Sequence, residues 1–167
     1  MDRFIHRHLP HSTWPMALLA GLGSALGVGL LGYLSEITTF IMLVAPFGAT
    51  CVLLFASPAS PVSQPVNVVA GHVLGAVIGL LLHFIMPGSF IAEGLSVGLA
   101  VSAMMLLRIV HPPAGATALV AYLTATSWWF VLFPVAVGSI GLVIIAAIFH
   151  PVTKVTYPHP VPEKKDA

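Results

Sequence analysis

The sequence predicts an all-α polytopic membrane protein with six hydrophobic segments, arranged as two repeats of three segments each. Three observations lead to this fold class. Hydrophobic residues make up 58% of the 167 residues and charged residues only 7%, against about 25% charged residues in an ordinary soluble domain. Only three charged side chains lie between Arg7 and Lys154, too few to cover the surface of a soluble fold. The chain also repeats itself at an offset of 67 residues.

The same composition excludes several classes of protein. One cysteine, Cys51, cannot form a disulfide framework. Six Lys and Arg against five Asp and Glu make no basic surface for nucleic acid. The sequence has no Ser-His-Asp set, no phosphate-binding glycine loop followed by lysine, and no paired intramembrane carboxylates, so we expect no enzyme activity. We expect no cofactor and no metal site, because only the tail histidines His6, His8 and His11 cluster, and they could chelate only weakly.

Each hydrophobic segment follows from local signals. Trp14 and Pro15 open the first segment, with tryptophan at the interface and proline in the first helical turn. The second segment is interrupted by Pro46 and Gly48, and the fifth has only about a dozen residues, so both are expected to be broken or re-entrant. Serines and prolines between the second and third segments indicate a loop. The six segments are 14–34, 37–55, 66–86, 90–107, 114–125 and 128–149.

The basic residues predict the orientation of the chain. We expect residues 1–13 and 151–167 to be cytoplasmic tails around a single transmembrane domain, 14–150, because both tails carry Lys or Arg. Two cytoplasmic termini require an even number of crossings. Six crossings place Arg108 inside and four place it outside, so this rule favours six. We expect a bacterial-type inner (plasma) membrane, and a homodimer, because closed twofold assemblies are the commonest.

The repeat is clearest at its central motif. Pro46-Phe47-Gly48-Ala49-Thr50 matches Pro113-Ala114-Gly115-Ala116-Thr117 without a gap. Nine identities occur over residues 45–86 at this offset. Repeat one therefore covers about 14–86 and repeat two about 87–150. If all three segments of each repeat cross the membrane, the repeats are inverted, which is a common transporter architecture. The alternative is a duplicated helix hairpin that is kept only for packing.

The repeated motif predicts an anion site. Proline favours a helix start or a helix break at this point, and a helix N-terminus presents free N–H groups with partial positive charge. Such a terminus is a ready anion site. Two of them could face one anion from opposite sides. The candidate residues from the two copies are Gly48, Ala49, Thr50, Gly115, Ala116 and Thr117.

Four further residues are candidates, each with a structural alternative. Arg108 is the one basic residue of the hydrophobic body, and it either attracts the anion or extends to the lipid headgroups. His111 either bonds an anion and exchanges a proton near neutral pH or bonds loop carbonyls. His72 is an ionisable residue inside a span, which favours a function, or it bonds a neighbouring helix. Asn67 either binds substrate or caps the third segment.

Two blocks of the sequence resemble a known family. The stretch from Arg108 to Thr117, with its His-Pro-Pro, resembles the signature of the HPP family of integral membrane proteins. Gly48-Ala49-Thr50, Ser57-Pro58, Gln64-Pro65, Asn67 and Gly71-His72 look like the other family block, and the resemblance covers about residues 15–150. Family members are often described with four helices, whereas this sequence has six hydrophobic segments. Plastid and cyanobacterial relatives are implicated in nitrite transport, so the resemblance implies nitrite or a similar small monovalent anion as substrate.

Two hypotheses for function follow. The first is a membrane transporter or channel for a small monovalent anion, with nitrite leading, bound at the helix N-termini of the two Pro-x-Gly-Ala-Thr motifs. A proton-coupled carrier that uses His111 or His72 is a refinement of it. The second is a non-transporting membrane subunit or regulatory partner protein, in which the two motifs pack without water.

Overall fold

The structure is a computed structural model that describes residues 2–7, 11–124 and 127–160. Every regular element in this part of the chain is helical, so the prediction of an all-α fold is confirmed. Three helical stretches of the described chain are long and apolar enough to cross a membrane: α2 (Trp14–Ile37), α4 (Pro65–Ile85), and the consecutive elements η3 (Val131–Ala136) and α7 (Val137–Val152). A fourth apolar helix, α5 (Phe90–Leu106), is shorter.

The second and fifth hydrophobic segments form short helices. Residues 38–45 are not helical, and α3 (Pro46–Cys51) begins only at the first proline of the repeat motif and continues into a π-helical turn, η1 (Val52–Ala56). Helix α6 (Pro112–Thr124) has 13 residues and is about 20 Å long, while a bilayer core is about 30 Å thick. Both segments are therefore too short to span as single helices. Re-entry into the membrane stays a prediction.

Two short helical elements and several segment ends differ in detail from the prediction. The N-terminal α1 (Asp2–Ile5) and the 3-10 turn η2 (Pro61–Ser63) lie in predicted tail and loop regions. The first predicted segment ends at residue 34, whereas α2 continues to Ile37 and includes Glu36. The last segment is broken at Phe133, whose backbone is extended. Pro134 follows it, and proline disfavours the helical conformation in the residue before it. The end of the predicted fifth segment and parts of both predicted tails fall outside the described residues.

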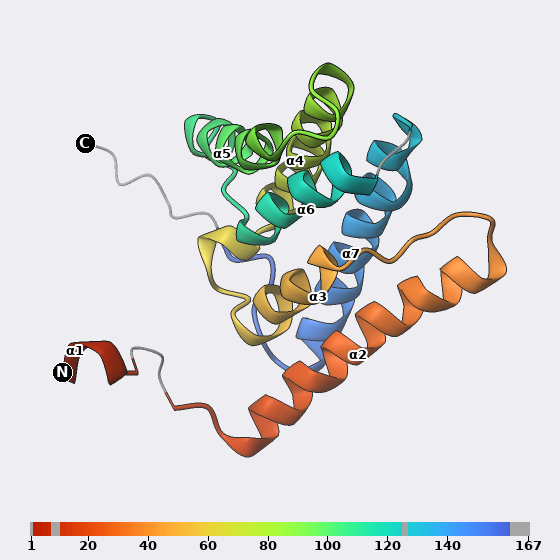
Figure 1. The fold of residues 1–167 in the computed structure, drawn as a ribbon. Coiled ribbons are helices and arrows are strands. Elements are labelled where there is room, and N and C mark those ends of the chain that lie inside the picture. The colour runs from red at the N-terminus through yellow and green to blue at the C-terminus, as the bar shows by residue number, and fades with distance from the viewer. Residues whose placement is uncertain (1, 8–10, 125–126, 161–167) are drawn as a thin grey trace, which may run out of the picture.

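The helices pack as two bodies. In the first body, α2, α3, η1 and α7 share one hydrophobic core with Leu31, Phe47 and Leu142 at its centre. In the second body, α4, α5, α6 and η3 surround two smaller cores that include Leu80 and Met104. Figure 1 shows α2 lying beside α7, with α4, α5 and α6 gathered at the other end of the molecule. We call the boundary between the two bodies the seam; here α3 packs on α6 and touches α4 through the contacts of Thr50 and Phe47 with His72.

Glycines bring backbones into contact inside the bodies. A Cβ atom added at Gly75 or Gly79 of α4 would collide with a backbone carbonyl oxygen of α6, that of Ala114 or Ala118 respectively. Small residues allow helices in lipid to approach this closely. Helices α4 and α6 therefore pack with almost no side chain between their backbones.

Two glycine contacts recur at the repeat offset. A Cβ at Gly71 would lie 3.3 Å from the carbonyl oxygen of Ile109, and a Cβ at Gly138 would lie 3.1 Å from that of Met42. The two glycines, Gly71 and Gly138, are 67 residues apart, and so are their two partners, Met42 and Ile109. The two repeats thus make equivalent contacts. A glycine of α4 packs on the segment before α6, and a glycine of α7 packs on the segment before α3. Their inversion relative to a membrane stays a prediction.

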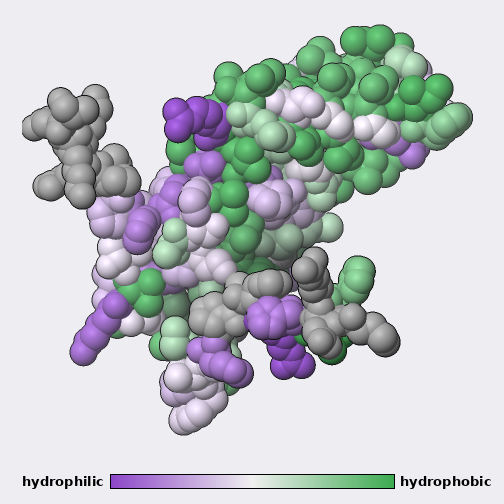
Figure 2. Space-filling model, turned by 90° about the vertical axis from the view of Figure 1, so that its left-hand side faces the viewer, coloured by the Kyte–Doolittle hydropathy of each residue, from purple (hydrophilic) through white to green (hydrophobic). Residues whose placement is uncertain are grey.

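The outer surface is strongly apolar. Large hydrophobic side chains point outward along the long helices, such as Leu18, which is 64% exposed, and Ile148, which is 66% exposed. Figure 2 shows a nearly continuous hydrophobic surface at the level of α4 and α5, with hydrophilic residues gathered lower on the same face. Such a surface is suited to contact with lipid chains.

Candidate functional site

Four buried polar side chains meet at the seam. They are Thr50 of α3, His72 of α4, His111 of the segment before α6, and Thr117 of α6, and each is 0% exposed. We call them the His–Thr cluster. The first two belong to repeat one and the last two to repeat two. Thr50 and Thr117 occupy equivalent positions in the two copies of the motif.

One continuous chain of hydrogen bonds joins the cluster. The two ring nitrogens of His72 bond the two equivalent threonines: Nε2 lies 2.7 Å from Oγ1 of Thr50, and Nδ1 lies 2.7 Å from Oγ1 of Thr117. Oγ1 of Thr50 also lies 3.1 Å from Nε2 of His111. The chain ends where Nδ1 of His111 lies 2.7 Å from the carbonyl oxygen of Val62.

The carbonyl of Val62 fixes the direction of this chain. A carbonyl only accepts, so Nδ1 of His111 donates, and in a neutral ring its Nε2 can only accept. The hydroxyl of Thr50 satisfies this nitrogen when it donates to it rather than to the carbonyl of Pro46. Thr50 in turn accepts from Nε2 of His72, which leaves Nδ1 of His72 to accept from the hydroxyl of Thr117. In this arrangement both imidazoles are neutral, each ring nitrogen has a partner, and every donor points the same way, from Thr117 toward Val62.

The surroundings of the cluster are apolar and uncharged. The ring of Phe47 meets His72 edge-on at 5.2 Å between centroids, and the two histidine rings lie 4.8 Å apart. Among the side chains whose burial is described, no Asp, Glu, Lys or Arg is buried. Arg108 is exposed. The cluster therefore holds hydrogen-bonding groups in a low-dielectric region without a fixed charge.

The two sequence motifs contribute their threonines to the cluster, together with the carbonyls of Pro46 and Pro113 and the ring of Phe47. Gly48, Ala49 and Ala116 are exposed on their helices. Gly115 is buried, and an added Cβ there would lie 3.8 Å from Cγ1 of Val97 in α5. The structure thus brings together Thr50 and Thr117 with both predicted histidines, while Gly48, Ala49 and Ala116 are exposed and Gly115 faces α5.

Arg108 and Asn67 shape the segment that carries His111. Arg108 adopts a left-handed backbone conformation with φ of 58°, and the N–H of Ile109 donates to the carbonyl of Met104 at 2.9 Å. This geometry is a helix C-terminal cap in which glycine is the usual residue. Nδ2 of Asn67 donates to the carbonyl of Val110 at 3.0 Å. Both residues therefore position the backbone next to the cluster.

Sequence reasoning missed the backbone acceptors of the cluster. Besides the carbonyl of Val62, the carbonyl of Pro46 lies 3.2 Å from Oγ1 of Thr50, and that of Pro113 lies 3.4 Å from Oγ1 of Thr117. The spacing of the repeat motif contained part of this signal, because a threonine four residues after a helical proline can reach that proline's carbonyl.

A second pair of histidines also follows the repeat. Nδ1 of His83 lies 2.7 Å from the carbonyl oxygen of Tyr122, and Nε2 of His150 lies 2.8 Å from that of Leu54. Each histidine sits near the end of a long helix and bonds a carbonyl of the short helix in the other half. These bonds hold the ends of α6 and η1 in place.

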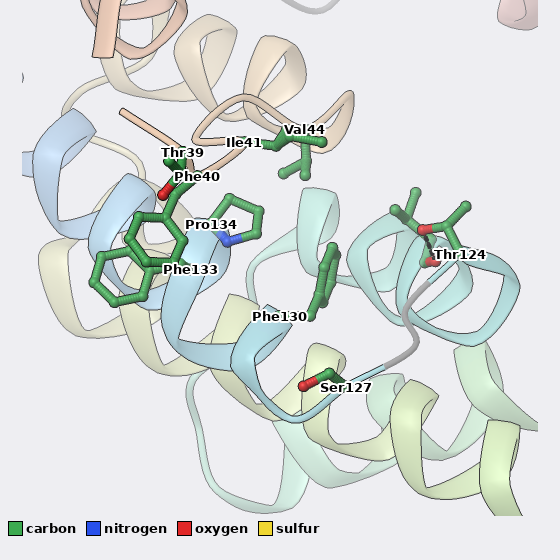
Figure 3. A pocket seen from close by; sticks show the side chains of 10 residues that line it. Thr39, Phe40, Ile41, Val44, Thr124, Ser127, Phe130, Phe133 and Pro134 are labelled. Carbon is green, nitrogen blue, oxygen red and sulfur yellow. Dashed lines mark hydrogen bonds between the residues drawn. The ribbon is translucent and has the colours of Figure 1, made fainter. Parts of the chain in front are cut away.

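A pocket of about 420 Å³ opens outside the cluster. Figure 3 shows it between the segment that precedes α3, the end of α6 and η3, with Phe40 beside Phe133 on one side; these two rings stack at 4.5 Å. Val44, which lines the pocket, is the repeat counterpart of His111. The other lining residues are Thr39, Ile41, Val120, Thr124, Ser127, Phe130 and Pro134.

Metal-binding side chains do not gather in the described part of the chain, where no three His, Cys, Asp or Glu residues lie close enough to hold an ion. The polar chemistry of the site therefore rests on imidazole, hydroxyl and backbone groups.

Comparisons with known proteins agree on the class of molecule. The family model described as "HPP, transmembrane region" matches residues 9–158. A transmembrane protein of Dictyostelium discoideum is 34% identical over 139 residues, which cover 76% of this chain and 45% of that protein. A second transmembrane protein of the same organism is 30% identical over 145 residues, covering 81% and 50% respectively. The chain thus spans about half the length of these curated relatives. No solved structure matches it significantly.

Proposed function

We propose, from the premise that this chain belongs to the HPP family of integral membrane proteins, that it transports a small monovalent anion, with nitrite as the leading substrate. The observation that carries the proposal is the His–Thr cluster: four fully buried polar side chains, two from each repeat, at the seam between two packed bodies. Polar and ionisable side chains inside a membrane protein are costly and mark transport pathways by default.

The chemistry of the cluster suits a small anion. Nitrite is planar and monovalent, so two hydroxyls and an imidazole N–H could replace much of its hydration. His111 directly precedes α6, and at a helix N-terminus the helix dipole adds a contribution of about 0.3–2 kcal/mol. Without a fixed cation at the cluster, binding would be loose, as conduction requires. In this proposal the cluster opens at the seam to admit the anion.

The remaining features of the proposal concern the assembly. We place the protein in a bacterial-type inner membrane with both termini in the cytoplasm and the two repeats inverted, and we expect a homodimer. The equivalent contacts of Gly71 and Gly138 support a pseudo-twofold relation between the repeats, which is the arrangement found in many transporters with a central site.

One observation favours a second candidate, a membrane subunit that assembles with a partner and transports nothing. The polar side chains of the cluster satisfy one another, and none of them lines the pocket of Figure 3. A purely structural cluster would look the same. Measurement of transport therefore has to decide between the two candidates.

The deciding measurement is nitrite uptake into proteoliposomes. We expect saturable uptake by the wild-type protein, and at least about a tenfold loss in Thr50→Val and Thr117→Val, because a hydrogen bond to a charged group contributes about 1.5–3 kcal/mol and about 1.4 kcal/mol is tenfold. Valine keeps the shape of threonine while it removes the hydroxyl.

Thr124→Val is the matched control. Its hydroxyl makes the same bond to the carbonyl four residues back, that of Val120 at 2.8 Å, but it is exposed at the end of α6. The control should transport as the wild type does. Folded wild-type protein that gives no uptake above empty vesicles for nitrite and other small anions would contradict the proposal and favour the partner subunit.

A further inference from the structure

We propose that the His–Thr cluster binds one proton together with each anion, so that this protein is an electroneutral proton–anion symporter. The inference rests on the proposed function, because it concerns what accompanies the anion through the same site. It follows from the charges around the cluster and from the acceptors available to its two hydroxyls.

A buried anion at the cluster has no permanent counter-charge. The hydrophobic body contains one basic residue that is always charged, Arg108, and its side chain is exposed. An unpaired charge in a low-dielectric region is strongly unfavourable. The only cluster groups that can become positive are the imidazoles of His72 and His111. A proton on one of them would neutralise the anion within the site.

His72 can accept that proton without displacement of a heavy atom. Its Nδ1 accepts from the hydroxyl of Thr117 at 2.7 Å in the neutral state. When Nδ1 gains a proton, the hydroxyl hydrogen must turn to another acceptor, and the carbonyl oxygen of Pro113 lies 3.4 Å from the same Oγ1. Thr117 then accepts from the imidazolium and donates to Pro113.

His111 can also take up a proton without displacement of a heavy atom, on the other side of the cluster. Its Nε2 accepts from the hydroxyl of Thr50 at 3.1 Å. On protonation this hydroxyl can turn to the carbonyl oxygen of Pro46, which lies 3.2 Å away, while Thr50 accepts from the imidazolium. The two threonine–proline pairs are equivalent under the repeat. Thr50 serves His111 and Thr117 serves His72, and each hydroxyl can either donate to its histidine or accept from it.

The groups that face the cluster favour a single proton. The rings of His72 and His111 lie 4.8 Å apart, and two positive charges at this distance oppose each other. The other described titratable residues on the elements packed around them are held elsewhere or lie farther out: His83 and His150 bond carbonyls at the helix ends, and Tyr122 bonds the loop before α5. Cys51 and Tyr157 lie in the core of the first body, Glu93 is half-buried on α5, and Glu36 is exposed.

The experiment measures the proton that travels with the anion. Proteoliposomes with a trapped pH indicator receive nitrite at a fixed concentration, and the uptake of empty vesicles is subtracted because undissociated nitrous acid crosses bare lipid. We expect one proton to enter with each nitrite and no response to a potassium diffusion potential. We also expect uptake to rise, by at most about tenfold per pH unit, as the pH on the entry side falls.

A matched pair of variants on α4 tests the assigned residue. His72→Gln keeps an amide that can bond both threonines but cannot take up a proton, and nitrite-driven proton entry should fall at least tenfold. His83→Gln makes the same change at the other end of the helix and should leave proton entry unchanged. Retention of full proton entry by folded His72→Gln, or equal loss in both variants, would overturn the role of His72.

The outcomes separate this inference from the proposed function. Nitrite uptake that carries net charge and no proton would overturn the symport proposal while it supports anion transport. Absence of any nitrite uptake would overturn both. If His72→Gln fails to fold, the proton-to-nitrite ratio of the wild type still decides the inference, because a ratio near zero contradicts it.

Discussion

Gly79→Ala is expected to destabilise the folded protein by about 3 kcal/mol, the upper part of the usual range for overpacking. The added Cβ would collide with the backbone carbonyl of Ala118, and a backbone cannot move aside as a flexible side chain can. Helices α4 and α6 would have to separate, which also disturbs the cluster that they carry. Thermal unfolding of the purified protein in detergent, followed with size-exclusion chromatography, measures the effect.

Gly21→Ala provides the control for Gly79→Ala. Both glycines lie inside long helices, so both substitutions gain similar intrinsic helix propensity, about 1 kcal/mol. A Cβ at Gly21 meets nothing within 4 Å. The control should be as stable as the wild type or more stable. Equal unfolding temperatures for the two variants would contradict the close packing of α4 on α6.

Phe47→Ala is expected to cost about 3–5 kcal/mol, the usual range for truncating a buried aromatic side chain. Phe47 is completely buried at the centre of the first body, where its ring lies against Gly138 of α7 and edge-on to His72. Removal leaves a cavity between the cluster and the core. The control is Phe90→Ala, because Phe90 is 81% exposed at the start of α5 and should tolerate truncation.

A double variant makes the Phe47 prediction specific. Gly138→Ala places a Cβ 2.5 Å from the Phe47 ring, so this substitution alone should destabilise the protein. In the Phe47→Ala background that collision disappears, and the added methyl partly fills the cavity. The two substitutions should therefore be strongly non-additive. Additive effects would show that α7 does not pack on Phe47.

Hydropathy and proline placement predicted much of the fold. Apolar length predicted α4 and α5 to within one residue at each end, and the prolines at 46, 112 and 113 predicted where α3 and α6 begin. The depth of each side chain could not be predicted in this way. In a membrane protein the lipid-facing and core-facing residues are both apolar, so the sequence does not distinguish exposed Leu18 from buried Leu31.

The candidate site was predicted by residue type rather than by arrangement. Thr50 and Thr117 were singled out as members of the repeated motif, and His72 and His111 as ionisable residues of the hydrophobic body. Their connection through both ring nitrogens of His72 depends on how α3, α4 and α6 meet, and no local pattern encodes a contact between residues this far apart. The left-handed conformation of Arg108 was hidden for a similar reason, because glycine is the usual signal for it.

The exchange of helices between the two halves has a consequence for biogenesis. Helix α7 of the second half completes the core around α3, and α4 of the first half completes the core around α6. When the ribosome has made only the first half, α3 lacks α7, and Thr50 and His72 lack Thr117 and His111. Neither half can therefore mature alone in the bilayer. The last helix to be synthesised, α7, closes the core around α3, and η3 just before it adds Val135 to the core around Leu80. A truncated nascent chain is therefore a natural target for membrane quality control.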